Sequence, residues 1–130
     1  MSKAILLSIH PEWAQKIYSS EKTVEWRKTF PKGYSGIVFL YETAPVKKVT
    51  GFVIVVGFSG VNMNEYGTSI YAETMIKCGC VDKESLRKYQ GHSEYVFGWL
   101  ISKSDKYIKP MSLETFGLKR PPQSWQYVEV

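Results

Sequence analysis

The sequence contains few cysteines and no long apolar run, and both absences narrow the class of protein. The only cysteines, Cys78 and Cys80, are one residue apart, which is too close for an ordinary structural disulfide, and no second pair completes a zinc site. The longest apolar run, residues 52–58, is far shorter than the roughly 20 residues of a membrane span. We therefore expect a soluble, cytoplasmic protein with reduced thiols and no membrane partner.

Sequence motifs of the common cofactor enzymes are also missing. The sequence has no Walker loop, no Gly-x-Ser-x-Gly elbow, no paired-glycine dinucleotide fingerprint and no zinc-protease helix. Its two histidines, His10 and His92, have no metal-ligand spacing to Cys, Asp or Glu. We expect no metal and no cofactor. His10, next to Pro11, is placed to line a cleft, although a structural role is the favoured interpretation.

The composition is that of a globular, basic domain. Hydrophobic residues make up 44% and aromatic residues 15% of the 130 residues, enough for a single core, so we expect one domain over residues 1–130. Lys and Arg number 17 against 12 Asp and Glu, a net charge of +5. This excess favours phosphate-bearing partners, or it is an ordinary solvated surface, because the charges form no single run.

Hydrophobic periodicity predicts an α+β fold in which a small, curled sheet or barrel is flanked by helices. Pro11 opens a helix directly after the first strand, and Gly51 and Gly57 mark bends in a long strand. In chain order the patterns predict strand 4–9, helix 11–21, strand 23–28, loop 30–36, strands 37–41 and 49–58, helical segments 73–76 and 82–89, strand 95–102, a helical turn at 111–116 and a closing strand at 126–130.

Charged residues converge on the predicted strand 23–28. Glu25 and Arg27 are two residues apart and share one face, and Lys22 comes just before them. One interpretation is a solvated face with exposed ion pairs, which contribute little stability. The other is a polar cleft in which Arg27 grips a phosphate or base edge, Lys22 adds a charge or a base, and Glu25 orients one of them.

A second cluster lies in residues 119–125, where paired prolines stiffen the chain before the last strand. Gln123 and Ser124 can donate and accept hydrogen bonds at a base edge, and Trp125 or Tyr41 can stack on a base. The alternative is that Trp125 is a core aromatic and that the prolines only shape a loop.

The order of these segments resembles the small bacterial and phage ASCH-domain proteins. The resemblance rests on residues 5–12, 20–27, 41–51 and 117–125 and spans nearly the whole chain. It implies a PUA-like fold, a small closed or partly closed β-barrel with helices packed at its mouth, and an association with RNA binding and RNA modification. It also implies a cleft motif at Lys22, Glu25 and Arg27, with Ser20 at the usual glycine, and a lesser contribution from Gln123 and Ser124.

One branch of that family resembles an amidohydrolase that deacetylates acetylcytidine with a lysine, a threonine and a glutamate. Lys22 matches the lysine, but Glu25 replaces the threonine and Met75 stands where the glutamate belongs, with Glu73 nearby. The leading hypothesis is therefore a module that binds RNA, or DNA, through Lys22, Glu25, Arg27, Tyr41, Gln123 and Ser124.

Two alternatives remain beside this hypothesis. One is a hydrolase of a modified nucleoside or of RNA, with Lys22 as base and Glu25 as acid or orienting group. The other is a protein-interaction barrel whose charged cleft is merely solvated. The sequence leaves the oligomeric state open.

Overall fold

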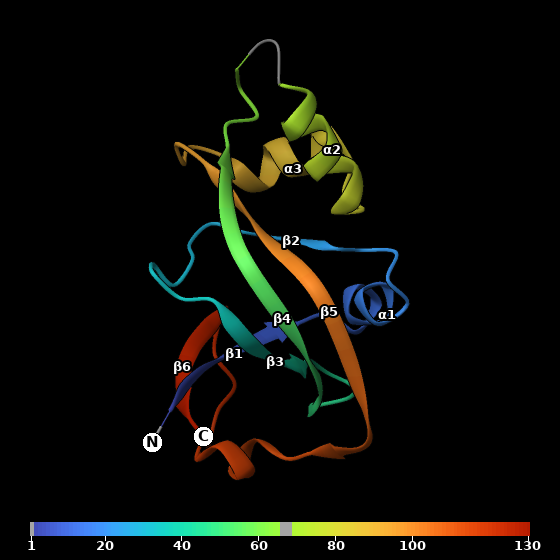
Figure 1. Cartoon of the computed structure of the whole chain (residues 1–130), viewed down its shortest axis with the longest axis vertical. Helices are drawn as coiled ribbons and strands as arrows, with labels where there is room; N and C mark the ends of the chain where they lie inside the picture. The colour runs from blue at the N-terminus through green and yellow to red at the C-terminus, as the bar shows by residue number, and fades with distance from the viewer. Residues whose placement is uncertain (1, 66–68) are drawn as a thin grey trace.

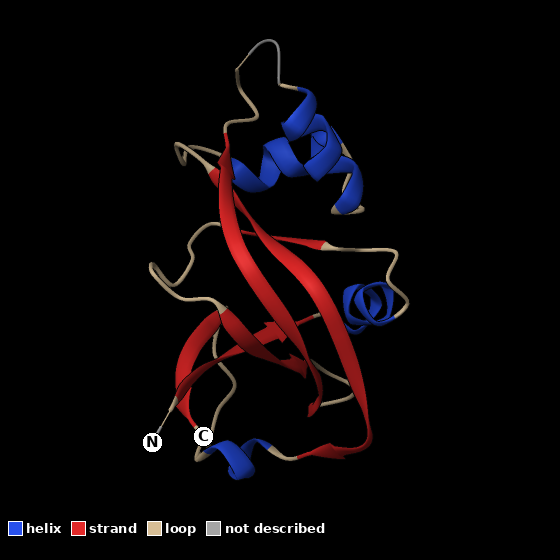
Figure 2. Ribbon diagram, in the orientation of Figure 1, coloured by secondary structure: helices blue, strands red, loops and turns tan. Residues whose placement is uncertain are grey.

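The first and last strands of the chain pair with each other at one side of a curled mixed sheet. The computed structural model describes residues 2–65 and 69–130. Figures 1 and 2 show the arrangement. The elements are β1 Lys3–Ile9, α1 Pro11–Tyr18, β2 Val24–Arg27, β3 Gly36–Glu42, β4 Lys48–Val61, α2 Ile70–Cys78, α3 Lys83–Gln90, β5 Val96–Met111, the 3-10 helix η1 Leu113–Phe116 and β6 Trp125–Glu129.

The six strands form one sheet in the order β2-β5-β4-β3-β1-β6. Strand β1 pairs with β3 in parallel, and the other neighbours are antiparallel. The long strands β4 and β5 run the length of the molecule, with α2 and α3 at one end and α1 beside β5 (Figure 1). The expected α+β class is confirmed. The expected closure of the sheet into a barrel is not observed, because no backbone pairing among the described residues joins the edge strands β2 and β6.

Most predicted elements are present, and the largest differences have local causes. Strand β5 continues to Met111 instead of ending at 102, and it does so through polar residues that conceal the strand pattern. Helix α1 ends at Tyr18 instead of 21, because Ser20 adopts a left-handed φ of 67° that interrupts the helix. Glycine, which the resemblance implies at this position, is the residue that adopts this conformation at least cost.

Strand β2 separates a polar face from an apolar face, as its alternation predicts. Val24 and Trp26 are buried in the cluster beneath α2 and α3. Glu25 and Arg27 point to the opposite face, on the same side as the paired residues Trp99 and Phe97 of β5. Trp99 is fully buried in the main core, between the sheet and α1. The charged residues of β2 therefore lie at the edge of the main core and not on an open surface.

The bends predicted at Gly51 and Gly57 coincide with irregularities in the pairing of β4 with β5. The two glycines differ in their surroundings. A Cβ on Gly51 would lie 2.3 Å from the Asp105 carbonyl oxygen and 2.6 Å from the Tyr18 hydroxyl. A Cβ on Gly57 would come no closer than 4.0 Å to Leu100. Of these two glycines, only Gly51 is required by close packing.

No helix of the described chain is long and apolar enough to cross a membrane.

We predict that Gly51→Ala destabilises the fold while Gly57→Ala does not. Overpacking against a backbone carbonyl should lower the free energy of unfolding by about 2 kcal/mol at Gly51. The change at Gly57 should stay within about 0.5 kcal/mol. Urea denaturation of the two variants beside the unaltered protein measures both values, and equal stability of the two variants would contradict this packing account.

Candidate functional site

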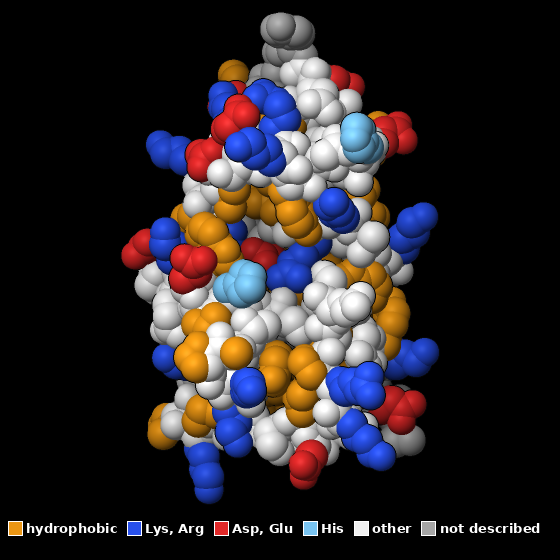
Figure 3. Space-filling model, turned by 180° about the vertical axis from the view of Figure 1, so that it is seen from behind, with side chains coloured by type: hydrophobic (Ala, Val, Ile, Leu, Met, Phe, Trp, Pro, Cys, Tyr) orange, Lys and Arg blue, Asp and Glu red, His pale blue; other side chains and the backbone are white. Residues whose placement is uncertain are grey.

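A cavity of about 480 Å³ opens where β1, α1, β2, α3 and the segment before β6 meet. In the space-filling view, an acidic and a basic side chain lie in the hollow at the centre of this face, next to a histidine (Figure 3). The lining residues are Ser8, Ile9, His10, Trp13, Lys22, Glu25, Trp26, Arg27, Thr43, Val81, Leu86, Tyr89, Gln123 and Ser124.

Lys22 forms the deepest charged part of the cavity wall. Its side chain is only 1% exposed, and its Nζ donates to the Gly79 carbonyl oxygen at the end of α2. The same nitrogen lies 3.4 Å from Glu25 Oε1 and 5.0 Å from the centre of the Trp13 ring. A buried ammonium group is costly unless it is paired. These partners hold the charge in place.

Glu25 connects Lys22 to Arg27. One carboxylate oxygen, Oε1, faces Lys22, and the other, Oε2, accepts from Arg27 Nη2 at 2.7 Å and Nε at 3.1 Å. Glu25 is also buried, so the carboxylate is shielded from water and the ion pairs are stronger than pairs on a surface. Two cations thus share one anion, and the network keeps a surplus positive charge.

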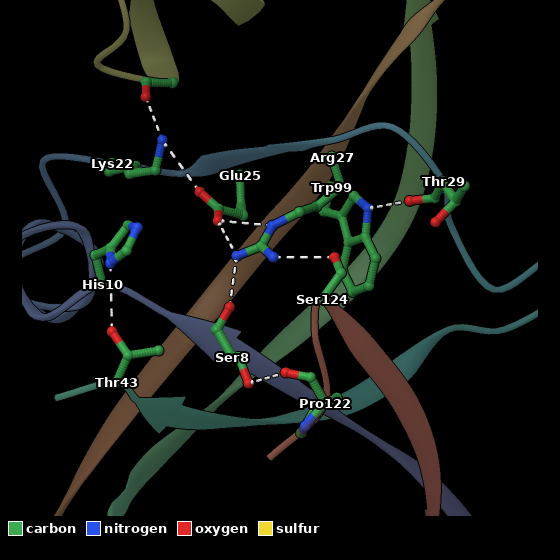
Figure 4. A network of polar contacts seen from close by, with 11 residues as sticks. Ser8, His10, Lys22, Glu25, Arg27, Thr29, Thr43, Trp99, Pro122 and Ser124 are labelled. Carbon is green, nitrogen blue, oxygen red and sulfur yellow. Dashed lines mark hydrogen bonds and ion pairs between the residues drawn. The ribbon is translucent and has the colours of Figure 1, made fainter. Parts of the chain in front are cut away.

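Arg27 extends this network across the gap between the two edges of the sheet. Its Nη1 donates to Ser124 Oγ at 3.0 Å, and its Nη2 donates to the Ser8 carbonyl oxygen at 2.7 Å (Figure 4). Ser8 Oγ in turn donates to the Pro122 carbonyl oxygen at 2.7 Å. A side chain from β2 therefore fixes β1 and the segment before β6. In the described chain no backbone ladder joins β2 to either of these strands.

Burial shifts two ionisations at this site. Desolvation lowers the pKa of Lys22 below its ordinary value, and the negative charge of Glu25 opposes the shift. Burial raises the pKa of Tyr89, with the positive charge of Arg27 opposing it. The cavity wall therefore combines an amine that releases its proton at a lower pH than usual with a phenol that keeps its proton to a higher pH than usual.

Five residues predicted for the site from sequence line the same cavity: Lys22, Glu25, Arg27, Gln123 and Ser124.

Tyr41 and Trp125 have other surroundings. Tyr41 is buried in a separate core cluster with Ala4 and Leu6, and it does not line the cavity. Trp125 packs edge-on against Trp99 with ring centres 6.0 Å apart, and its Nε1 donates to Thr29 Oγ1. The structural interpretation of Trp125 is the one that these contacts support.

The helical insert, which comprises α2 and α3 between β4 and β5, contributes apolar and phenolic groups to the cavity and not the acid that the resemblance implies for the deacetylase branch. Met75 is buried in the core beneath α2. Glu73 lies 2.6 Å from Lys83 Nζ on a different surface, outside the cavity lining. The insert instead supplies Val81, Leu86 and Tyr89.

His10, which the sequence placed to line a cleft, lines the cavity together with Trp13, Thr43 and Tyr89, which the sequence did not indicate for the site. The position of His10 before Pro11, at the end of a strand, was the one signal for this group. The described residues bring together no three His, Cys, Asp or Glu side chains that could hold a metal ion.

The sequence is similar to two curated proteins. It is 29% identical over 131 aligned positions to ATP synthase subunit alpha of Ureaplasma parvum serovar 3, covering 98% of this chain but spanning only 15% of that protein. It is 30% identical over 131 positions to an ASCH domain-containing ribonuclease of Zymomonas mobilis, covering 94% of this chain and 82% of that protein.

Solved structures of the Zymomonas mobilis ASCH protein share the fold. One superimposes with a TM-score of 0.79 at 24% identity and covers 97% of this chain and 87% of its own. A variant with tyrosine replaced by phenylalanine gives a TM-score of 0.81 at 24% identity and covers 98% and 91%.

Residues 7–111 match the ASCH domain, which is more than half of the chain. Together with the curated ribonuclease relative and the shared fold, this match shows that the chain belongs to the ASCH domain family.

Proposed function

We propose that this protein binds single-stranded RNA in the cavity of Lys22, Glu25 and Arg27 and cleaves it. The observation that carries the proposal is the cationic network in the cavity wall. The relative from Zymomonas mobilis, which is a ribonuclease, supports cleavage in addition to binding. We also propose that residues 1–130 act as one unit, because β6 follows the matched segment yet pairs with β1.

The cavity suits one nucleotide in size and chemistry. Its volume of about 480 Å³ is typical of small-molecule sites, which span roughly 300–1,000 Å³. Trp13 and Tyr89 give it aromatic surface on which an unpaired base can stack, and the Gln123 amide can read a base edge. A splayed base of single-stranded RNA fits this combination better than a stacked duplex does.

Arg27 is the group that we assign to the phosphate. A guanidinium carries five N–H donors, and four of those of Arg27 bond to Glu25, Ser8 and Ser124. One Nη1 N–H has no partner among the described residues. The Arg27 side chain is 13% exposed, so this donor can reach a bound anion while the other four hold the group rigid.

Lys22 and Glu25 act behind Arg27 in this proposal. Lys22 is enclosed, so we assign it a stabilising positive charge and not direct contact with the substrate. Both oxygens of Glu25 already face cations, and we assign Glu25 the orienting role. Deacetylation of acetylcytidine is less well supported, because Glu25 replaces the threonine of that branch and Met75 lies in the core.

We predict that Arg27→Ala weakens binding of a single-stranded RNA oligonucleotide about 10-fold and slows its cleavage about 100-fold, because the phosphate loses a rigid donor. Fluorescence anisotropy and gel analysis of labelled RNA measure the two effects. Arg27→Lys keeps the charge but loses the planar donors. Its affinity for RNA and its cleavage rate should lie between those of Arg27→Ala and of the unaltered protein.

Arg87→Ala is the matched control, because it removes an arginine from outside the cavity lining. It should leave binding and cleavage within about 2-fold, apart from a small loss of charge attraction. Thermal unfolding shows whether each variant is folded at the assay temperature. Cleavage by a folded Arg27→Lys variant at the unaltered rate, or no cleavage of RNA by any of these proteins, would overturn the assignment.

The lowered pKa of Lys22 predicts a specific pH dependence of stability. Between that lowered pKa and the ordinary value of 10.5, the unfolded chain binds a proton that the folded protein has released. The free energy of unfolding of the unaltered protein should therefore rise with pH in this window relative to that of Lys22→Met. The slope of the difference cannot exceed about 1.4 kcal/mol per pH unit.

Chemical denaturation of both proteins from neutral pH to pH 10.5 measures this difference. Lys22→Met has nothing to titrate at this position, and all other groups are shared. A difference that stays flat or falls with rising pH would show that burial does not destabilise the charged form of Lys22.

A further inference from the structure

Cleavage of RNA requires proton transfer, and the charged side chains of the cavity are poorly placed to provide it. Lys22 is enclosed by Gly79 and Glu25, and Glu25 faces Lys22 and Arg27 with both oxygens. Arginine does not give up its proton in proteins. The remaining titratable groups in the lining are Tyr89 and His10. Burial raises the pKa of Tyr89, which makes its phenolate scarcer.

His10 differs from Lys22, Glu25 and Arg27 because it is exposed and has no ion-pair partner among the described residues. Its Nδ1 lies 3.3 Å from Thr43 Oγ1. Its other nitrogen, Nε2, points to the side of the cavity where Lys22 and Glu25 lie (Figure 4). Histidine exchanges protons readily near neutral pH.

The position of His10 is fixed by the backbone on both sides. It precedes α1, and its carbonyl oxygen accepts from the Trp13 and Ala14 amides at 3.1 Å each. The Thr43 amide donates to the carbonyl oxygen of the neighbouring Ile9 at 2.9 Å, which holds Thr43 beside the imidazole. Glu42, the other acid beside Thr43, is buried and accepts from Gln15. The ring is thus held at the mouth of the cavity by neutral groups.

We propose that His10 is a catalytic residue that accepts a proton from the ribose 2′-hydroxyl of the bound RNA, with Thr43 as the positioning residue for its ring. This inference rests on the proposed RNA cleavage in the same cavity. It also defines the class of substrate, because DNA lacks the 2′-hydroxyl and cannot react in this way.

The step balances without any further reactant. Nε2 takes the 2′-hydroxyl proton, and the 2′ oxygen forms a bond to the adjacent phosphorus. The bond from phosphorus to the 5′ oxygen of the next nucleotide breaks, and that oxygen takes a proton from water. The products are an RNA end with a 2′,3′-cyclic phosphate and an RNA end with a free 5′-hydroxyl. Arg27 lies where it can stabilise the charge that develops on the phosphate oxygens.

The test compares His10→Ala with His92→Ala, which removes an exposed histidine outside the cavity lining. His10→Ala should cleave single-stranded RNA at least about 100-fold more slowly and bind it nearly unchanged, since general-base catalysis contributes roughly 100- to 10,000-fold. Free imidazole should restore part of its rate. His92→Ala should behave like the unaltered protein.

The outcomes separate the two proposals. Cleavage by the unaltered protein with a rate that His10→Ala retains, or with products that carry a 5′-phosphate, would overturn the role of His10 and leave RNA cleavage standing. Failure of the unaltered protein to cleave RNA would overturn both. A slow His10→Ala variant that imidazole rescues, with cyclic phosphate ends, would support the inference. Thr43→Val should show a smaller loss of rate with the same products.

Discussion

The carboxylate of Glu25 faces two cations at once, and the shape of the cavity depends on this contact. Lys22 and Arg27 come from opposite ends of one short segment, and neither is stable in a buried position without the shared anion. Through Lys22 the network is tied to Gly79 and the helical insert, and through Arg27 to Ser8 and Ser124. The two cations that share this carboxylate thus connect their own segment to three parts of the chain that are distant in sequence.

The alternation of apolar and polar residues, together with turn residues, predicted most of the elements and the shared face of Glu25 and Arg27. Both features depend on residues that are near one another in the sequence. The sequence could not predict that Ser8 and the Gly79 carbonyl complete the network, since their contacts are long-range backbone bonds without a residue signature. The same limit explains Tyr41: its place on a strand was predictable, but which face of that strand met the cavity was not. Gln123 and Ser124 were indicated by their hydrogen-bonding side chains beside the paired prolines, and the family resemblance implies a lesser contribution from the same two residues.

The network also suggests how one fold serves different chemistry. The resemblance implies a threonine three positions after the lysine in the deacetylase branch, whereas here that position holds the carboxylate of Glu25, which pairs with both Lys22 and Arg27. The helical insert contributes Tyr89 and Leu86 in place of an acid. In the proposed function, this arrangement holds an anion, and proton transfer is assigned to a group at the mouth of the cavity.

The free energy of unfolding of Glu25→Gln tests the central role of this carboxylate most directly. Glutamine keeps the size of the side chain but leaves the buried Lys22 and the partly buried Arg27 without their shared anion, so the free energy of unfolding at neutral pH should fall by about 3 kcal/mol. Glu84→Gln is the matched control, because it alters an exposed pair with Arg87, and it should change stability by less than about 0.5 kcal/mol. Equal stability of Glu25→Gln and the unaltered protein would contradict the account.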